Sequence, residues 1–349
     1  MAASPHILLV RLSAIGDIVF ASPLIAVLRR AYPGARITWL VQPEYRAILE
    51  RHPDLDEVLT WPIGEWRELW RQWRFVGLMR SLRAFRKHLR LHRFDLALDL
   101  QGLLKSGAVT YLSGARERIG LGSREGSRWL MTRVVPRGGE HTRIGSEYLF
   151  LARCLGLSTQ GFAMALHYGS EAADFARDLI ERLGMSRGYA VLCPFTTRPQ
   201  KHWLAACWAE LSDRIWAELG LPVVVLGGPG DRPAARHIRD LTARGLILLA
   251  GRTTLSQAAA MIDGSTLLVG VDTGLGHMGI ASGRPSLLLF GATCPYLDTT
   301  RANARVLYHP LDCSPCKRKP TCNGAFTCMR SITVDEVLKM AKGLLGQMV

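Results

Sequence analysis

The stretch from residue 267 to residue 290 limits most strongly which fold this chain can adopt. An apolar run over 267–271 ends at Asp272, and a short segment of small residues that carries His277 follows it. A second apolar run over 286–290 comes next. This order of strand, turn, helix and strand is typical of an open parallel sheet, which presents its binding loops at the carboxyl ends of its strands.

Similar apolar runs, each followed by a loop, recur along the rest of the chain. They cover residues 6–12, 37–41, 94–100, 189–193 and 222–226. We therefore predict an α/β protein with two mostly parallel sheets, because 349 residues exceed the usual size of one core. The expected domains span residues 1–165 and 166–332, and a C-terminal helix over 333–349 could pack back on the first domain.

Composition and charge narrow the class of protein. The hydrophobic content of 48% excludes a disordered chain. No apolar run approaches the roughly 20 residues of a membrane-spanning helix, and the N-terminus lacks the features of a signal peptide, so we expect a soluble cytoplasmic protein. Lys and Arg total 44 against 29 Asp and Glu. This excess predicts an anionic partner: nucleic acid, anionic lipid or a phosphorylated substrate.

Two loops in the first half carry candidate reactive groups. Asp17 follows Gly16 soon after the first apolar run, and the glycine lets a ligand approach closely, so Asp17 is a candidate base. The carboxylate could instead only complement the dipole of the helix that begins there. Lys105 lies one turn into the helix after 94–100, at the same predicted sheet edge, and could meet an anionic group of an acceptor.

A D-x-D sequence stands at Asp54 and Asp56. Such a pair can hold a divalent metal beside a diphosphate. Here it lies in a connection before a short strand, and we interpret it as structural.

The loops of the second half suit a nucleotide. Thr196, Thr197 and Lys201 follow the run 189–193 in a polar loop that could bind a diphosphate, although either threonine could simply cap the next helix. Asp231, after a glycine-rich turn, could accept a ribose hydroxyl or could only close that turn.

The turn after 267–271 favours an anion as well. Thr273 and Gly274 would lie at the first turn of a helix, where backbone N–H groups are free and the helix dipole attracts a phosphate. The alternative is an ordinary turn in which Asp272 only caps the helix.

Residues 66–93 are rich in tryptophan and arginine. Trp66, Trp70 and Trp73 recur at helical spacing, and arginines fill the other faces, so we predict a basic amphipathic helix, broken near Gly77. Such a helix fits docking on an anionic membrane or grip on a phosphorylated glycolipid. Its second half could equally be a core-facing helix with an arginine-rich solvent side.

Eight cysteines are too few and too clustered for a disulfide scaffold. Four stand in apolar surroundings and are interpreted as buried thiols: Cys154, Cys193, Cys207 and Cys294. Four more lie close together in the tail and form a candidate zinc or iron–sulfur site, or a set of surface thiols: Cys313, Cys316, Cys322 and Cys328.

Five segments taken in order carry a resemblance to a known family. They read VRLSAIGD, LDLQGLLKSG, FTTRPQKHW, LGGPGD and GVDTGLGH. Over essentially its whole length the chain resembles glycosyltransferase family 9, the ADP-heptose:lipopolysaccharide heptosyltransferases, and within it the enzymes that add the first heptose to Kdo. The cysteine tail departs from that branch. The resemblance implies the GT-B fold, two Rossmann-like domains facing across a cleft, with the acceptor held by the first and the nucleotide sugar by the second.

The resemblance also implies roles for particular residues. Asp17 becomes the general base. The residues expected to bind the donor nucleotide are Thr196, Thr197, Lys201, Asp231, Asp272, Thr273, Gly274 and His277. We assign acceptor binding to another set: Ser13, Gly16, Arg67, Lys105 and Arg124. The expected reaction is inverting, needs no metal or other cofactor, and moves heptose from ADP-heptose to Kdo-lipid A or a heptosylated inner core.

The expected enzyme is a monomer, peripherally associated with an anionic inner membrane. A basic nucleic-acid-binding protein is the main alternative from another class, but no nucleic-acid-binding motif is recognisable. A sugar-nucleotide epimerase would need a dinucleotide fingerprint that the chain lacks. A transferase of the same family with another donor or acceptor stays open.

Overall fold

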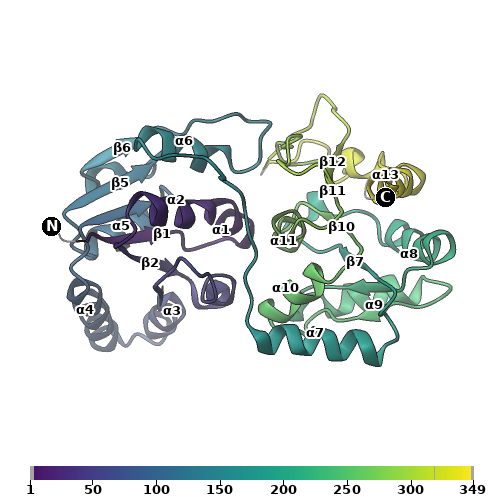
Figure 1. Ribbon diagram of the computed structural model, residues 1–349, viewed down its shortest axis with the longest axis horizontal. Coiled ribbons are helices and arrows are strands. Elements are labelled where there is room, and N and C mark those ends of the chain that lie inside the picture. Colours follow the sequence, from purple (N-terminus) through teal and green to yellow (C-terminus); the bar gives the residue numbers. More distant parts are fainter. Residues whose placement is uncertain (1–3, 318, 347–349) are drawn as a thin grey trace. The chain divides into compact units, whose positions relative to one another are not determined.

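The computed structural model describes residues 4–317 and 319–346 and divides into two compact units (Figure 1). The first unit holds the chain up to residue 140 together with residues 145–163. The second holds residues 141–144 and the chain from residue 164 onward. Each unit is described below by itself.

The first unit is built on a sheet of six parallel strands in the order β3-β2-β1-β4-β5-β6. The strands are β1 His6–Val10, β2 Arg36–Val41, β3 Glu57–Thr60, β4 Leu96–Asp99, β5 Glu117–Leu121 and β6 Arg133–Val135. The helices are α1 Ile15–Ala21, α2 Pro23–Ala31, α3 Ile63–Arg71, α4 Phe75–Leu91, α5 Leu104–Leu112 and α6 Ser146–Cys154, with 3-10 turns η1 Pro43–Ile48 and η2 Ser127–Leu130.

The second unit repeats this plan with six parallel strands in the order β12-β11-β10-β7-β8-β9. The strands are β7 Ala190–Cys193, β8 Val223–Val225, β9 Ile247–Leu248, β10 Leu267–Val271, β11 Ser286–Phe290 and β12 Ala304–Tyr308. The helices are α7 Ser170–Arg182, α8 Ala205–Leu219, α9 Arg232–Asp240, α10 Leu255–Asp263, α11 Gly274–Ser282, α12 Thr327–Arg330 and α13 Val334–Gly346, with 3-10 turns η3 Pro199–Lys201 and η4 Pro229–Asp231.

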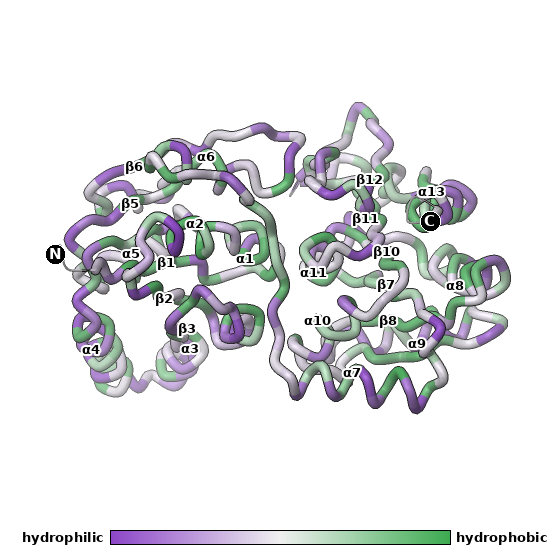
Figure 2. The backbone as a smooth tube through the Cα atoms, in the orientation of Figure 1, coloured by the Kyte–Doolittle hydropathy of each residue, from purple (hydrophilic) through white to green (hydrophobic). Residues whose placement is uncertain are grey.

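The strands form the cores because helices cover both faces of each sheet. Every residue of β10 and β11 is buried, and Figure 2 shows hydrophobic residues along the central strands. Continuous apolar runs of this kind are typical of parallel strands that are covered on both faces. The predicted α/β class with two mostly parallel sheets is confirmed.

Each sheet has a point where the strand order reverses. In the first unit the chain moves outward from β1 to β2 and β3, and then returns to place β4 on the other side of β1. In the second unit β10 returns in the same way beside β7. Loops that leave neighbouring strands in opposite directions open a crevice at the carboxyl edge, which is where ligands bind in open α/β sheets.

Two predicted helices are interrupted. The helix after the first strand divides into α1 and α2, because Pro23 begins α2 and has no N–H to continue the hydrogen-bonding of α1. The basic helix over residues 66–93 breaks at Gln72–Arg74 rather than near Gly77, and Trp73 there has a left-handed backbone with φ of 57°. Gly77 lies inside α4.

The C-terminal helix α13 packs in the core of the second unit. Val337, Leu338 and Ala341 of α13 are fully buried in the core formed with β10 and β11. The apolar face of α13 therefore completes the layer beside α8. Among the described residues, no helix is long and apolar enough to cross a membrane.

Candidate active site

Lys201 and Asp272 form an ion pair at the point of strand reversal in the second unit. Lys201 ends η3 in the loop after β7, and Asp272 directly follows β10, the neighbouring strand. The Lys201 ammonium contacts Oδ2 of Asp272, and only 15% and 13% of the two side chains are exposed. Because both charges are mostly withdrawn from water, their attraction is screened less than that of a surface pair.

Two more side chains contact the Asp272 carboxylate, and a third contacts one of these two. Thr293 donates its hydroxyl to Oδ2 at 2.6 Å, and Nε2 of His277 lies 3.1 Å from Oδ1. The Tyr296 hydroxyl lies 2.5 Å from the other ring nitrogen of His277. Burial alone would raise the pKa of Asp272, but the hydrogen bond and charge of His277, with the charge of Lys201, hold that pKa well below its usual range. The carboxylate is therefore ionised across the whole neutral range.

The N-terminus of α11 opens beside this carboxylate. Thr273 is the N-cap residue in extended conformation and Gly274 begins the helix, as the sequence predicts. Asp272 does not cap α11, since its oxygens bond to Lys201, His277 and Thr293. The turn therefore keeps an anion-binding character, with first-turn N–H groups and a lysine beside it.

The other predicted donor residues lie on neighbouring loops of the same sheet edge. Thr196 is half-buried and its carbonyl oxygen lies 2.8 Å from Nε2 of His202, so the loop folds back on itself. Thr197 is exposed in the same loop. Asp231 follows β8, which neighbours β7, and its Oδ2 accepts the N–H of Gly228 at 2.7 Å. That bond closes the glycine-rich turn. Closing this turn is one of the two roles that the sequence suggests for Asp231.

The candidate base of the first unit is held by a buried arginine. Asp17 lies in the first turn of α1, and its Oδ2 contacts the Arg11 guanidinium and accepts the N–H of Ala14 at 3.4 Å. Arg11 is buried and donates to the carbonyl of Leu100 at 2.9 Å. Both of these contacts fall on Oδ2 of the carboxylate, and the Asp17 side chain is half-exposed.

The loop after β4 braces this arrangement from the neighbouring strand. Gln101 accepts the N–H of Leu12 through Oε1 at 3.1 Å. Asp99 accepts the N–H groups of Gln101 and Gly102, each at 3.0 Å, and burial raises the pKa of its carboxyl. Gly102 has φ of +68°, and a Cβ there would lie 2.3 Å from the carbonyl oxygen of Leu121. Only glycine fits this turn.

The predicted acceptor residues lie on several loops and helices that follow strands of the first unit. Ser13 and Gly16 belong to the loop and first turn that carry Asp17. Lys105 is exposed in the first turn of α5, and Arg124 joins that region because its N–H donates to the carbonyl of Gly102 at 2.8 Å. Arg67 is exposed on α3, which follows the edge strand β3.

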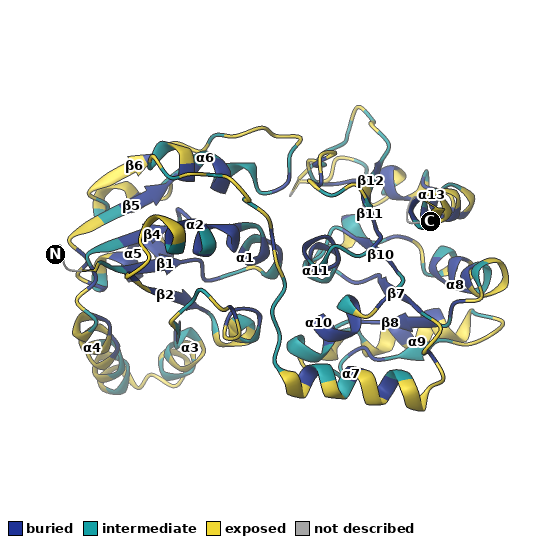
Figure 3. Ribbon diagram, viewed as in Figure 1, coloured by how far each residue is buried: buried dark blue, intermediate teal, exposed yellow. Residues whose placement is uncertain are grey.

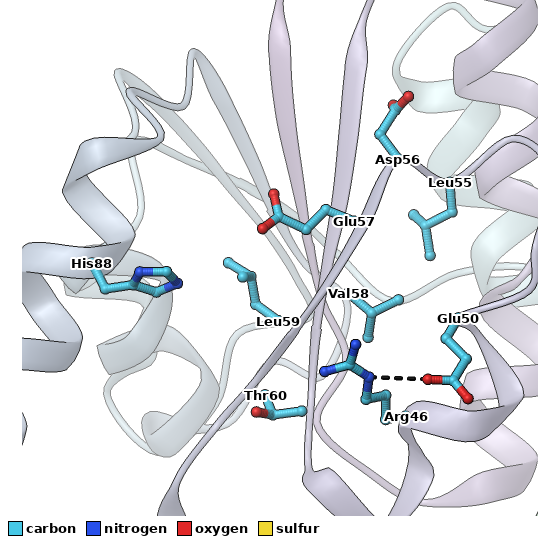
Figure 4. Close-up of a pocket in the computed structure, with 9 residues that line it drawn as sticks. All are labelled: Arg46, Glu50, Leu55, Asp56, Glu57, Val58, Leu59, Thr60 and His88. Carbon is cyan, nitrogen blue, oxygen red and sulfur yellow. Dashed lines mark hydrogen bonds and ion pairs between the residues drawn. The ribbon is translucent and has the colours of Figure 1, made fainter.

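A hollow of about 570 Å³ lies along β3 and holds none of the predicted site residues (Figure 4). It is lined by Arg46, Glu50, Leu55, Asp56, Glu57, Val58, Leu59, Thr60 and His88. Its charged groups are already paired: Arg46 bonds Glu50 at 3.1 Å, and Asp56 accepts from Arg29 and from the N–H of Ile37, each at 2.6 Å. The pairing of Asp56 supports the structural interpretation of the D-x-D sequence.

The tail cysteines lie near one another without forming a recognisable metal site. Burial, and then the neighbouring thiols of Cys316, Cys313 and Cys322, raise the pKa of the Cys328 thiol. Within the described part of the chain, however, no three Cys, His, Asp or Glu side chains have metal-binding geometry.

The predicted buried thiols are only partly confirmed. Cys193 is buried in β7, while Cys154 and Cys207 are partly exposed. Cys294 is exposed, because the chain has left the core after β11.

Sequence reasoning missed several residues of the site. Arg11 stands inside an apolar run, where nothing marks it as the partner of Asp17. Thr293 and Tyr296 follow β11, a third strand that ends at the same edge, so extending the strand-end argument to that loop would have identified them.

Comparisons with known proteins bear on this site. Residues 82–326 match the family described as glycosyltransferase family 9 (heptosyltransferase). Lipopolysaccharide heptosyltransferase 1 of Pseudomonas aeruginosa is 31% identical over 91% of this chain and 87% of its own length. A family 9 glycosyl transferase from Veillonella parvula has the same fold, with a TM-score of 0.85 at 21% identity, over 99% of both chains. The E. coli heptosyltransferase WaaC with ADP-2-deoxy-2-fluoro heptose gives a TM-score of 0.73 at 25% identity, over 97% of this chain and 99% of that one.

Proposed function

Because this chain belongs to glycosyltransferase family 9, and is therefore a glycosyltransferase, we propose that it transfers heptose from ADP-L-glycero-D-manno-heptose to the inner core of lipopolysaccharide. The acceptor would be Kdo-lipid A or an inner core that already carries heptose. The observation that carries the proposal is the grouping of Lys201, Asp272 and the N-terminus of α11 at one sheet edge. The similarity to a heptosyltransferase 1 and to a structure with an ADP-heptose analogue supports the donor.

The second unit would bind the donor. The Lys201 ammonium and the N–H groups at Thr273 and Gly274 are fixed positive groups of the kind that neutralise a diphosphate. Asp272 and His277 hold Lys201 and the α11 turn in place rather than react. Thr196 and Thr197 would add hydroxyl contacts to the diphosphate, and Asp231 would accept a ribose hydroxyl. Because these groups supply the positive charge that the leaving diphosphate needs, we propose that no divalent metal takes part.

The first unit would bind the acceptor and remove its proton. The Asp17 carboxylate takes the proton of the acceptor hydroxyl as that oxygen bonds to the anomeric carbon of the heptose. The bond from that carbon to the diphosphate oxygen breaks in the same step, and ADP leaves with the electron pair. One displacement inverts the anomeric configuration, through an oxocarbenium-like transition state. Because Arg11 and Ala14 contact Oδ2, we assign the proton to Oδ1.

Anionic acceptors suit the cations of the first unit. Lys105 and Arg124 lie near the loop after β4, and Arg67 lies on α3, so we propose that they bind carboxylate or phosphate groups of the acceptor together with Ser13 and Gly16. We further propose that the enzyme acts as a monomer at the cytoplasmic face of an anionic inner membrane. The net charge of +15 supports attraction to such a surface.

Two parts of this proposal have separate tests. Incubation with ADP-heptose and a panel of truncated core acceptors, followed by mass analysis, identifies which sugar receives the heptose. Calorimetry with ADP and with duplex DNA separates a nucleotide-sugar enzyme from a nucleic-acid-binding protein. We expect saturable ADP binding and only weak, salt-sensitive association with DNA.

A further inference from the structure

The turn between α3 and α4 gathers apolar side chains at the surface of the first unit. Trp73 adopts its left-handed backbone there, and the N–H of Arg74 bonds back to the carbonyl of Leu69 at 2.9 Å. The chain reverses at this point, so residues that one continuous helix would have spread along its length come together. Figure 3 shows this turn as exposed. We call its five apolar residues the aromatic tip: Trp70, Trp73, Phe75, Val76 and Met79.

The aromatic tip is unusually exposed for its chemistry. The exposed fraction is 64% for Trp70, 79% for Trp73 and 77% for Val76, and Phe75 and Met79 are exposed as well. The rings support one another, since the Phe75 ring lies 5.3 Å from that of Trp70 and 5.7 Å from that of Trp73. A contiguous patch of this kind on a single chain marks an interaction surface.

The tip is not a remnant of the core, because other residues of the same hairpin fill that role. Trp66 turns inward: its ring lies 5.3 Å from that of Phe85, and its Nε1 donates to Ser81 at 3.0 Å. Phe85 and Leu89 of α4 are buried against the sheet. The sequence placed Trp66 with Trp70 and Trp73 on one face, but the structure separates the anchoring tryptophan from the two exposed ones.

The helices that carry the tip are rich in cations. Residues 66–93 contain nine Lys and Arg and a single acidic residue, Glu68, which pairs with Arg71 at 2.7 Å. The flanking basic side chains are exposed on both helices: Arg71, Arg74, Arg80, Arg83, Arg86, Lys87 and Arg90. An apolar tip carried by two helices with exposed cations complements a surface that is apolar inside and anionic outside.

We propose that the aromatic tip inserts into the interface of an anionic lipid bilayer while the flanking arginines contact lipid phosphates. Tryptophan rings settle at the boundary between headgroups and acyl chains, and basic side chains near such a surface add attraction to it. Val76 and Met79 favour a bilayer over nucleic acid, because aliphatic side chains offer no ring on which a base can stack. The inference deepens the proposed action at a membrane, since it names the segment that reaches the lipid.

The test uses the full chain and vesicles, without donor or acceptor. Sedimentation with vesicles of phosphatidylcholine alone is compared with vesicles that contain phosphatidylglycerol. We expect clear binding only to the anionic vesicles and at least tenfold weaker binding after the combined change Trp70→Ser, Trp73→Ser and Val76→Ser. Each of Arg80→Gln and Arg83→Gln should weaken binding by about fivefold. Trp129→Ser is the matched control, because Trp129 is 81% exposed in the same unit, and it should bind like the parent.

Fluorescence quenching tests insertion of the tip into the bilayer separately from binding to its surface. Brominated acyl chains should quench the tryptophan fluorescence of the parent, and much less that of the tip variant. Equal vesicle binding and equal quenching in both proteins would overturn the proposal, as would a tip-dependent affinity for DNA with unchanged vesicle binding. The thermal unfolding transition of the tip variant should match that of the parent, which shows that its first unit is folded, since ADP binding would report only on the second unit. Vesicle binding without sugar transfer would leave this inference standing and refute the proposed reaction, so the two failures are distinguishable.

Discussion

Lys201 and Asp272 meet as an ion pair although 71 positions separate them in the chain, because parallel neighbours β7 and β10 end at the same sheet edge. Asp272→Asn would leave the Lys201 ammonium mostly buried without a full counter-charge. We expect this change to lower the free energy of unfolding by about 3–5 kcal/mol. Denaturant titration measures the effect.

Asp240→Asn is the control for this change, since Asp240 pairs with Arg239 at the surface of the same unit and its loss should cost less than about 1 kcal/mol. The pKa of Asp272 is lowered in the folded protein. Its stabilising contribution is therefore present above the ordinary aspartate pKa of about 3.9 and fades as the pH falls through the lowered value. The difference between parent and Asp272→Asn should shrink below about pH 4. Equal losses in the two variants at neutral pH would contradict the burial argument.

Lys201→Ala should weaken ADP binding by about ten- to 100-fold, because a charge-assisted contact to the diphosphate is lost. Turnover should fall as well, since the leaving diphosphate loses a fixed positive charge. Calorimetry and a transfer assay measure the two effects. Lys342→Ala, which removes a cation paired with Glu218, should leave both unchanged. A Lys201→Ala enzyme with parental affinity and rate would remove Lys201 from the donor site.

Asp17→Ala should reduce turnover by about 10²- to 10⁴-fold, the usual range for a general base, while ADP binding persists. The reason is that Asp17 belongs to the first unit and acts on the acceptor hydroxyl. Glu50→Gln in the same unit loses only a surface pair with Arg46 and serves as the control. Unchanged turnover in Asp17→Ala would exclude this residue from proton transfer.

Tyr296→Phe should weaken ADP binding, because it removes the hydroxyl that lies 2.5 Å from Nδ1 of His277 and so loosens His277 against Asp272. The free energy of unfolding should fall by about 1 kcal/mol, the net value of one hydrogen bond. Tyr308→Phe loses a comparable bond to the carbonyl of Ser314, outside this cluster. It should lower stability to a similar degree without affecting ADP. Equal effects of the two variants on ADP affinity would show that Tyr296 has no special part in the site.

A separate prediction concerns metal binding by the four tail cysteines. If they form a structural zinc or iron–sulfur site, anaerobically purified protein should contain about one equivalent of bound metal or cluster, and Cys316→Ser should lose it. Elemental analysis and the absorption spectrum measure this. A parent protein that contains neither metal nor cluster after anaerobic purification would show that the thiols have no ligand role. The proposed transfer reaction uses no group bound there.

The sheets and their binding edges could be predicted because short apolar runs ending in polar turns identify parallel strands directly. Asp272 directly follows such a run, Lys201 and His277 lie in the segments that follow the same two runs, and the structure brings all three together. The return of β10 to the side of β7 could not be predicted in the same way, since β8 and β9 lie between these strands in the chain.

Other features depend on packing that no local pattern specifies. Arg11 looks like an interruption of an apolar strand, and only the fold shows that it lies buried beneath Asp17. The tryptophans at 66, 70 and 73 have one helical spacing, yet the reversal at Trp73 turns Trp66 inward and leaves the others exposed. The sequence does not show which core the apolar face of α13 covers. In the structure that face packs in the core of the second unit.

The most direct test of the proposed function is the transfer assay itself, with ADP-heptose, Kdo-lipid A and the full chain, read by the mass of the acceptor. The parent should convert the acceptor to a product heavier by one heptose residue, release ADP, and do so in the presence of a metal chelator. Asp17→Ala should bind ADP and form product far more slowly. Failure to lengthen this or any other inner-core acceptor, by a protein that binds ADP normally, would contradict the central claim.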